Sequence, residues 1–268
     1  MGADIKNLRI RIRSVDSTLH LTKAMGLVAS SKIRRAMENM NKSRQYAEAL
    51  ADAVQVLCAS GECQKSPYMA RREGGKTKLI VIAGDRGMAG GYNANIFKLV
   101  RDYPDAEIVP LGKRACDRFG QATQSSEHFY AKEAYELAGK LCEQFCAGEF
   151  DRLGIVCTKY VSMMTQEATI RWVLPLTKRE NTPNFSGVIF EPDELTILST
   201  AVPEYLAGQI VAAVRESFAS EVAARRTAMD SAGKSAEEMI DKLQLAYNRA
   251  RQSAITQEIT EIVAGSGN

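Results

Sequence analysis

Residues 5–57 read IKNLRIRIRSVDSTLHLTKAMGLVASSKIRRAMENMNKSRQYAEALADAVQVL, and the spacing of the apolar side chains in this stretch dictates the architecture of the chain. Alternating steps of three and four residues meet an apolar or small side chain almost everywhere. The stripe comprises Ile5, Leu8, Ile12, Val15, Leu19, Thr22, Gly26, Ala29, Ile33, Ala36, Met40, Ser43, Ala47, Leu50, Val54 and Leu57. A seven-residue repeat sustained over this length predicts one continuous helix with a coiled-coil seam.

The predicted helix is too long to be covered by a small domain. At a rise of ~1.5 Å per residue it would extend for roughly 80 Å, against the ~30 Å span of a small domain. Its seam is narrow in the middle, where Thr22, Gly26 and Ala29 offer little side-chain volume. A partner helix can approach closely at such small residues. We therefore expect a second long helix to lie along this stripe.

The end of the chain supplies that second helix. A looser stripe has a mean spacing of about 3.6 residues, the period of an α-helix. It comprises Val211, Val214, Phe218, Val222, Arg225, Met229, Ala232, Ala236, Ile240, Leu243, Tyr247, Ala250 and Ala254, and Ile255, Ile259 and Ile262 follow it. Neither helix can bury its stripe alone, so the sequence predicts that the two pair as an antiparallel coiled coil.

The middle of the chain has a different character. All the prolines fall between Pro67 and Pro203, so nothing outside this interval forces a helix to break. Short apolar runs predict buried strands, with a longer helix between the second and third of them. The predicted strands are 78–83, 107–111, 153–157 and 168–174, and the helix is 130–147. Strands that alternate with helices favour a mainly parallel sheet covered on both faces.

The predicted fold class is therefore α/β. A central Rossmann-like α/β domain (61–204) is inserted between two long terminal helices (1–60 and 205–268), which form an antiparallel coiled coil. The longest apolar runs are far shorter than the ~20 residues that a membrane span needs. Charged residues from Lys6 to Arg13 interrupt any secretory signal, and a mitochondrial presequence remains the alternative reading of this arginine-rich start.

The cysteines predict free thiols rather than a metal site. The pairs Cys58/Cys63 and Cys142/Cys146 lack the two-residue gap of zinc sites, and the chain has only two histidines. No secretory signal is expected, so a reducing compartment is the natural interpretation for all six cysteines. Their positions are 58, 63, 116, 142, 146 and 157.

Charge is nearly balanced overall but uneven along the chain. The net formal charge is +3, whereas residues 1–50 contain 10 Lys and Arg against 4 Asp and Glu. A basic arm of this kind could bind nucleic acid, and an RNA-binding protein stays open as an alternative. Tyr46 is the only aromatic residue in this arm, and residues 221–268 contain 6 basic against 7 acidic residues. Both observations favour a solvated or partner-facing surface, so no nucleic-acid partner is expected.

A glycine-rich stretch, AGDRGMAGGYN (83–93), lies where phosphate-binding loops occur, between a predicted strand and a helix. Its glycines do not have the G-x-G-x-x-G spacing of a dinucleotide loop, and Gly91 precedes Tyr92 rather than the Lys-Ser/Thr of a Walker loop. We predict a tight turn that exposes Asp85 and Arg86. A nucleotide-dependent enzyme built on the α/β domain remains the main alternative, but we expect no catalytic residues, cofactor, metal or small-molecule substrate.

Several blocks resemble the gamma subunits of F-type ATP synthases of the bacterial type. They cover both ends and the middle: LTKAMGLVASSKIRRA (21–36), GDRGMAGGYN (84–93), EPD (191–193), PEY (203–205), SEVAARRTAM (220–229) and LQLAYNRARQSAITQEITEIVAGS (243–266). The chain departs from the family pattern at Gly84 and Ala89, which replace Ser/Thr and Cys, and at Arg226, which replaces a common methionine. The first two departures put in question a hydroxyl contact of the loop.

The resemblance implies a rotor shaft without catalytic residues of its own. Such a shaft couples proton flow through the membrane c-ring to ATP synthesis at the catalytic beta subunits. It implies the alpha, beta and epsilon subunits and the c-ring as partners, with indirect membrane association at the cytoplasmic face of the cell membrane. The positions that it implies as contacts with the beta subunits are Met25, Asp85, Arg86, Arg225, Arg251, Gln252, Thr256 and Glu258.

Overall fold

The computed structural model describes residues 2–72, 74–120, 124–178 and 190–265. The chain forms two compact units, residues 1–31 with 225–268, and residues 32–224. Both long helices run through this division, so its borders differ from the three sequence segments expected above, which stay a prediction. Each unit is described by itself.

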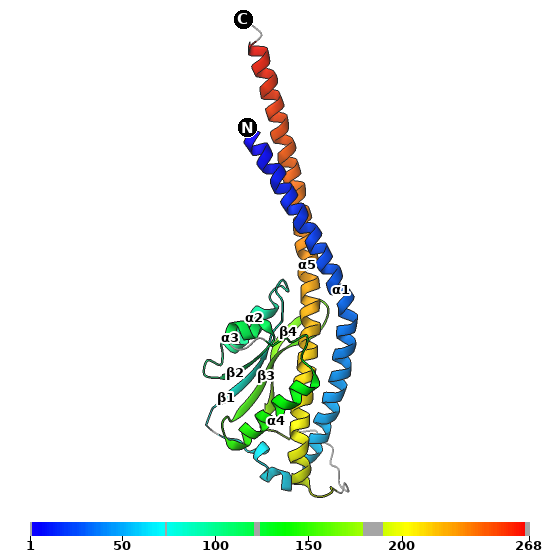
Figure 1. Cartoon of the computed structure of the whole chain (residues 1–268), viewed down its shortest axis with the longest axis vertical. Helices are drawn as coiled ribbons and strands as arrows, with labels where there is room; N and C mark the ends of the chain where they lie inside the picture. Colours follow the sequence, from blue (N-terminus) through cyan, green and yellow to red (C-terminus); the bar gives the residue numbers. More distant parts are fainter. Residues whose placement is uncertain (1, 73, 121–123, 179–189, 266–268) are drawn as a thin grey trace. The chain divides into compact units, whose positions relative to one another are not determined.

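The two terminal segments form the two longest helices (Figure 1). Helix α1 covers Gly2–Cys58, in agreement with the predicted stripe. Helix α5 covers Glu194–Gly265. It therefore begins earlier than the expected start near residue 205 and contains Pro203. The Asp193 carboxylate explains this start, since it accepts hydrogen bonds from the backbone N–H (2.9 Å) and the hydroxyl (2.7 Å) of Thr196.

In the first unit, α1 and α5 pair in opposite directions, as predicted. Arg9 donates a hydrogen bond to the hydroxyl of Tyr247 at 2.7 Å, and Lys23 lies 2.8 Å from Glu237. A Cβ at Gly26 would lie 3.7 Å from the Cβ of Met229. Residues of increasing number on α1 therefore contact residues of decreasing number on α5, as in antiparallel helices. Gly26 lies where the two helices approach closely, as the small residues of the seam predict.

The same antiparallel order continues independently in the second unit. Gln209 donates a hydrogen bond to the carbonyl of Ala47 at 3.0 Å. A Cβ at Gly208 would lie only 2.8 Å from Leu50 Cδ1, so this glycine lets the helices touch. Further along, Met40 of α1 packs in one cluster with Ala219 of α5.

The middle of the chain forms a four-stranded mixed sheet with the order β2-β1-β3-β4. The strands are β1 (Thr77–Ile82), β2 (Glu107–Leu111), β3 (Arg152–Tyr160) and β4 (Gln166–Leu174). Strand β1 pairs in parallel with β2 and β3, whereas β4 is joined to β3 by a hairpin and pairs antiparallel. The predicted strands and the mainly parallel order are thus confirmed, with one antiparallel edge strand.

Alternate side chains of the strands pack into two different layers of the protein. One face carries Ile80 and Ile155, which pack with α4 (Ala131–Ala147) and with the first half of α5. The other face carries Leu79 and packs with α2 (Tyr92–Val100) and α3 (Lys113–Phe119). Two short 3-10 helices, η1 (Glu62–Lys65) and η2 (Pro67–Met69), connect α1 to β1.

One helix, α5, contains an 18-residue window that is long and apolar enough to cross a membrane, with a mean hydropathy of 1.4. Half of this window is buried inside the protein. Fully buried residues such as Leu198, Leu206 and Ile210 pack in the core with the sheet and α4. The hydropathy of α5 is therefore accounted for by core packing.

The turn between β2 and α3 gives a sharp test of the fold. Gly112 has φ = +93°, and a Cβ there would lie 1.9 Å from the carbonyl oxygen of Ala83. Gly112→Ala should therefore destabilise the protein by several kcal/mol, through both backbone strain and a clash with backbone. Gly120→Ala is the matched control, since Gly120 has φ = +68° but open space around it, and should cost about 1–2 kcal/mol. Urea denaturation measures both, and equal losses would contradict this account.

Candidate functional site

The glycine-rich loop between β1 and α2 is held by its own polar groups. The side chain of Asn93 accepts a hydrogen bond from the backbone N–H of Gly84 at 2.9 Å. Met88 adopts a left-handed backbone with φ = +59°. The loop is a tight turn, as the spacing of its glycines predicts.

Asp85 is an anchor rather than a freely exposed side chain. Its carboxylate accepts hydrogen bonds from the hydroxyl of Ser125 at 2.5 Å and from three backbone N–H groups. These belong to Ser126 (2.9 Å), Glu127 (3.0 Å) and Lys113 (3.0 Å). The turn thus exposes Arg86 as predicted, but Asp85 only in part, because the carboxylate ties the loop to residues 113–127.

The pKa of Asp85 reflects opposed effects. Burial raises it, whereas the hydrogen bonds from Ser125 and from the backbone of Glu127, Lys113 and Ser126 lower it, and its pKa lies below the ordinary value. Glu127 behaves similarly: burial raises its pKa, but Lys32, at 2.7 Å, and then Arg86, at 3.9 Å, stabilise the charged form and lower it. The carboxylates therefore stay ionised and hold the loop in place.

The loop is also a poor cradle for phosphate. A Cβ at Gly84 would lie 2.7 Å from the carboxyl carbon of Glu221, so an acidic side chain of α5 faces the backbone where the loop begins. Glu221 is buried at 3% exposure. The Glu221 side chain occupies the space beside the backbone at the start of the loop and offers a phosphate acceptor oxygens rather than cationic donors, which argues against the nucleotide-dependent enzyme.

The predicted contact residues near the end of α5 are all exposed on its last turns. They are Arg251, Gln252, Thr256 and Glu258. The hydroxyl of Thr256 donates to the carbonyl of Gln252 at 2.9 Å, so this hydroxyl already has an acceptor within its own helix. Large apolar side chains lie among them, with Ile255 45%, Ile259 56% and Ile262 69% exposed.

The remaining predicted contact residues, Met25 and Arg225, are half-buried in the first unit. Asp85 and Arg86 belong to the second unit, so the predicted set is distributed over both. Their roles as contacts with beta subunits stay a prediction. All six cysteines are free thiols, and five of them are buried. In the described ranges no group of three or more His, Cys, Asp or Glu side chains is placed to hold a metal ion.

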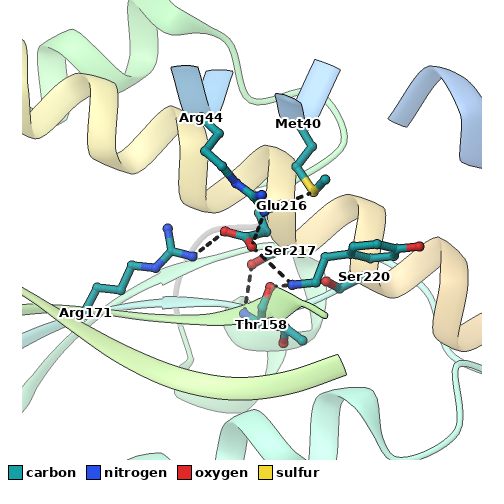
Figure 2. A network of polar contacts seen from close by, with 8 residues as sticks. Met40, Arg44, Thr158, Arg171, Glu216, Ser217 and Ser220 are labelled. Atoms are coloured by element: carbon teal, nitrogen blue, oxygen red, sulfur yellow. Dashed lines mark hydrogen bonds and ion pairs between the residues drawn. The ribbon is translucent and has the colours of Figure 1, made fainter. Parts of the chain in front are cut away.

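A buried polar network in the second unit was missed by the sequence analysis (Figure 2). Glu216 of α5 is 3% exposed and accepts hydrogen bonds from Arg44 of α1, at 2.9 Å, and from Arg171 of β4. It also accepts one from the backbone N–H of Tyr160 at 3.2 Å. The available signal was a glutamate inside an apolar stretch of α5, but its partners lie far away in the sequence.

Comparison with known proteins agrees with the fold. The ATP synthase family profile matches residues 4–267. The ATP synthase gamma chain of Ruminococcus albus is 40% identical over 283 residues, covering 99% of both chains. The sodium ion specific ATP synthase gamma chain of Acetobacterium woodii is 36% identical, again over 99% of both chains.

Solved structures show the same fold at low identity. A chain of Euglena gracilis mitochondrial ATP synthase, from its OSCP/F1/c-ring structure, superposes with a TM-score of 0.71 at 17% identity, covering 99% of this chain and 94% of that one. A rotor chain of the same enzyme has a TM-score of 0.62, also at 17% identity, covering 95% of this chain and 100% of that one. The fold of this chain, with two long antiparallel helices and a mixed sheet, is therefore also found in chains of solved ATP synthases.

The chain belongs to the ATP synthase gamma-chain family. The family assignment rests on similarity over nearly the whole length of the chain and of its relatives. It makes the protein a subunit of the membrane-bound ATP synthase complex.

The anchoring role of Asp85 is testable by its dependence on pH. Asp85→Asn should destabilise the isolated protein by about 1–3 kcal/mol at pH 7, since it weakens a buried acceptor of several hydrogen bonds. The folded-state pKa of Asp85 is lowered, so its stabilisation is complete above the ordinary pKa of 3.8 and is lost as the pH falls below that value. The difference from wild type should therefore shrink below about pH 3.8.

The matched control is Asp117→Asn, because Asp117 is exposed on α3. It should change the free energy of unfolding by less than about 0.5 kcal/mol at any pH. Denaturant titrations between pH 2.5 and pH 7 give the measurement. A constant gap between Asp85→Asn and wild type over this range would show that the carboxylate charge does not hold the loop.

Proposed function

We propose that this chain is the central rotor shaft of its ATP synthase. It couples ion flow through the c-ring, with the proton as the expected ion, to ATP synthesis at the beta subunits. Its proposed partners are the alpha and beta subunits, the epsilon subunit and the c-ring, and the proposed site of action is the cytoplasmic face of the cell membrane. The similar solved chains support this, since they come from structures of the OSCP/F1/c-ring part and of the rotor of a mitochondrial ATP synthase.

The observation that carries the proposal is the end of α5. Within the first unit, Arg9 is hydrogen-bonded to Tyr247 and Gly26 packs next to Met229. These two pairs fix the antiparallel register, in which moving one residue forward on α1 corresponds to moving about one residue back on α5. At this register the start of α1 lies near the level of Ala254. Among the described residues of α1, none lies level with the last turns of α5, and these turns carry exposed apolar side chains.

Those last turns are suited to contact other subunits. Ile255, Ile259 and Ile262 are exposed on the same turns as the polar residues Arg251 and Glu258. Exposed apolar side chains that lie close together mark contact surfaces. A helix end that presents different side chains around its circumference contacts each surrounding subunit differently, and so favours a different conformation in each one.

We also propose that the chain has no catalytic role of its own. Support comes from the glycine-rich loop, which faces the buried side chain of Glu221, and from the α5 end, where the hydroxyls of Thr256 and Thr260 donate to backbone carbonyls of their own helix. The turnover of ATP is left to the partner subunits. The shaft acts by imposing its asymmetry on them.

Direct observation of rotation tests the proposal, and the chain contains an exposed cysteine to which a probe can be attached. Cys146 is the only exposed thiol of the six, while burial raises the pKa of Cys58 to about 11 and of Cys142 to about 12. Thiolates are the reactive form, so a maleimide probe should attach at Cys146. In a complex reconstituted with alpha and beta subunits, the probe should rotate in one direction when ATP is added.

The chain alone, labelled in the same way, serves as the control and should hydrolyse no ATP. A Cys146→Ser complex should turn over ATP but show no labelled rotation. A probe that stays still while the complex hydrolyses ATP would refute the rotor role. Turnover by the purified chain alone would instead support the nucleotide-dependent enzyme.

The α5 end has its own test. The triple variant Ile255→Ser, Ile259→Ser, Ile262→Ser should leave the melting temperature of the isolated chain within a degree or two, because these side chains are exposed. ATP synthesis in reconstituted vesicles should fall several-fold. The control Ser253→Ala, Gln257→Ala changes exposed polar residues of the same turns and should have little effect. Full synthesis by the triple variant, at normal complex yield, would show that these apolar side chains do not transmit coupling.

A further inference from the structure

The second unit contains an open pocket of about 480 Å³ whose walls come from two helices and two strands. Helix α1 contributes Arg44 and Glu48, the paired strands β3 and β4 contribute Lys159 and Arg171, and helix α5 contributes Glu216. Alanines of the two helices, Thr169 and Gln209 line the rest of the wall. The volume lies in the range of small-molecule sites, about 300–1,000 Å³.

Two arginines are held in place at this pocket by one buried carboxylate. One carboxylate oxygen of Glu216 accepts a hydrogen bond from Arg44, and the other accepts one from Arg171 (Figure 2). The backbone N–H of Tyr160 fixes Glu216 from a third side at 3.2 Å. The two guanidinium groups approach Glu216 from different sides, as Figure 2 shows, and their positions are set before any ligand arrives.

Both arginines have further N–H groups that are not used in binding Glu216. Each engages Glu216 through Nη2, and the one other contact of Arg44 is a distant one to the sulfur of Met40 at 3.8 Å. In the part of the chain that the structure describes, Nε and Nη1 of both groups make no hydrogen bond. Arg44 and Arg171 remain 41% and 31% exposed, so these donors are accessible. Lys159 is exposed nearby and lies opposite Glu167 in the sheet register, but makes no ion pair among the described residues.

We propose that this pocket binds a phosphate-bearing small molecule. Three cationic side chains face two carboxylates in the lining, and Glu216 is already shared between the arginines, which leaves an excess of positive charge. Guanidinium groups match the oxygens of phosphate through parallel N–H donors, and lysine adds a point charge. The ligand would link α1, the edge of the sheet and α5, and this inference does not depend on the rotor function.

A small ligand fits the geometry better than an acidic protein segment. The cationic groups come from two sides of the pocket, helix α1 and the edge of the sheet, so a compact group with oxygens on several sides can reach all of them. A single carboxylate side chain presents only two oxygens. A phosphate monoester or pyrophosphate presents more oxygens and carries more than one negative charge at pH 7, which suits the number of available donors.

Isothermal titration of the full-length chain with inorganic pyrophosphate at fixed ionic strength tests the proposal. Binding to the wild type is expected, and Lys159→Gln should weaken it on the order of fivefold through the loss of one nearby charge. Glu48→Gln should strengthen binding, on the order of twofold, because it removes a repelling charge at the exposed rim. Neither side chain is buried, so both variants should fold.

Lys140→Gln on α4 is the matched control, since it removes an exposed lysine that does not line the pocket. It should bind pyrophosphate as the wild type does. No heat of binding at millimolar pyrophosphate would overturn the proposal, and so would equal losses in Lys159→Gln and Lys140→Gln. Binding of a poly-glutamate peptide without binding of pyrophosphate would replace the small ligand with an acidic protein segment.

Discussion

Two apolar stripes that cannot be buried alone constrain everything else in this protein. A long helix gains little from its intrinsic propensity in water and depends on a neighbour to cover its apolar face. Helix α1 finds that neighbour in α5, while α5 also packs its first half against the sheet. The α/β part therefore shares its core with both paired helices, through the first half of α5 and through Val54 and Leu57 near the end of α1, and the network at Glu216 is built on α5.

Small residues decide how closely the helices approach. Gly26 and Gly233 lie on opposite helices in the first unit, each within 4 Å of partner side chains once a Cβ is added. Gly208 would not accept a Cβ without moving Leu50. Large apolar residues such as Leu21 and Leu27 lie off the apolar stripe of α1 and are exposed. In the proposed rotor these outward side chains are available to the surrounding subunits.

Much of this fold could be predicted because its signals are local. The heptads of α1 and the short apolar strands depend only on neighbouring residues, and both were placed within a few residues. The start of α5 was missed because Pro203 resembles a boundary, whereas the Asp193 cap lies further upstream. Asp85 was predicted to be exposed and Glu216 was overlooked, and both errors have another reason. Their roles depend on partners such as Ser125 and Arg171, which only the folded chain brings near.

The polar residues of α5 have a mechanical meaning in a shaft. Apolar contacts are non-directional, so an apolar helix surface can slide or turn against its neighbour at small cost. Hydrogen bonds have preferred geometry. Ser220 donates to the carbonyl of Thr158 at 3.2 Å, and Ser217 accepts from the N–H of the same residue at 3.2 Å. Together with Glu216, these bonds hold one face of α5 against strand β3. A helix held by these hydrogen bonds cannot rotate about its own axis without breaking them. The transmission of torque requires this resistance to rotation.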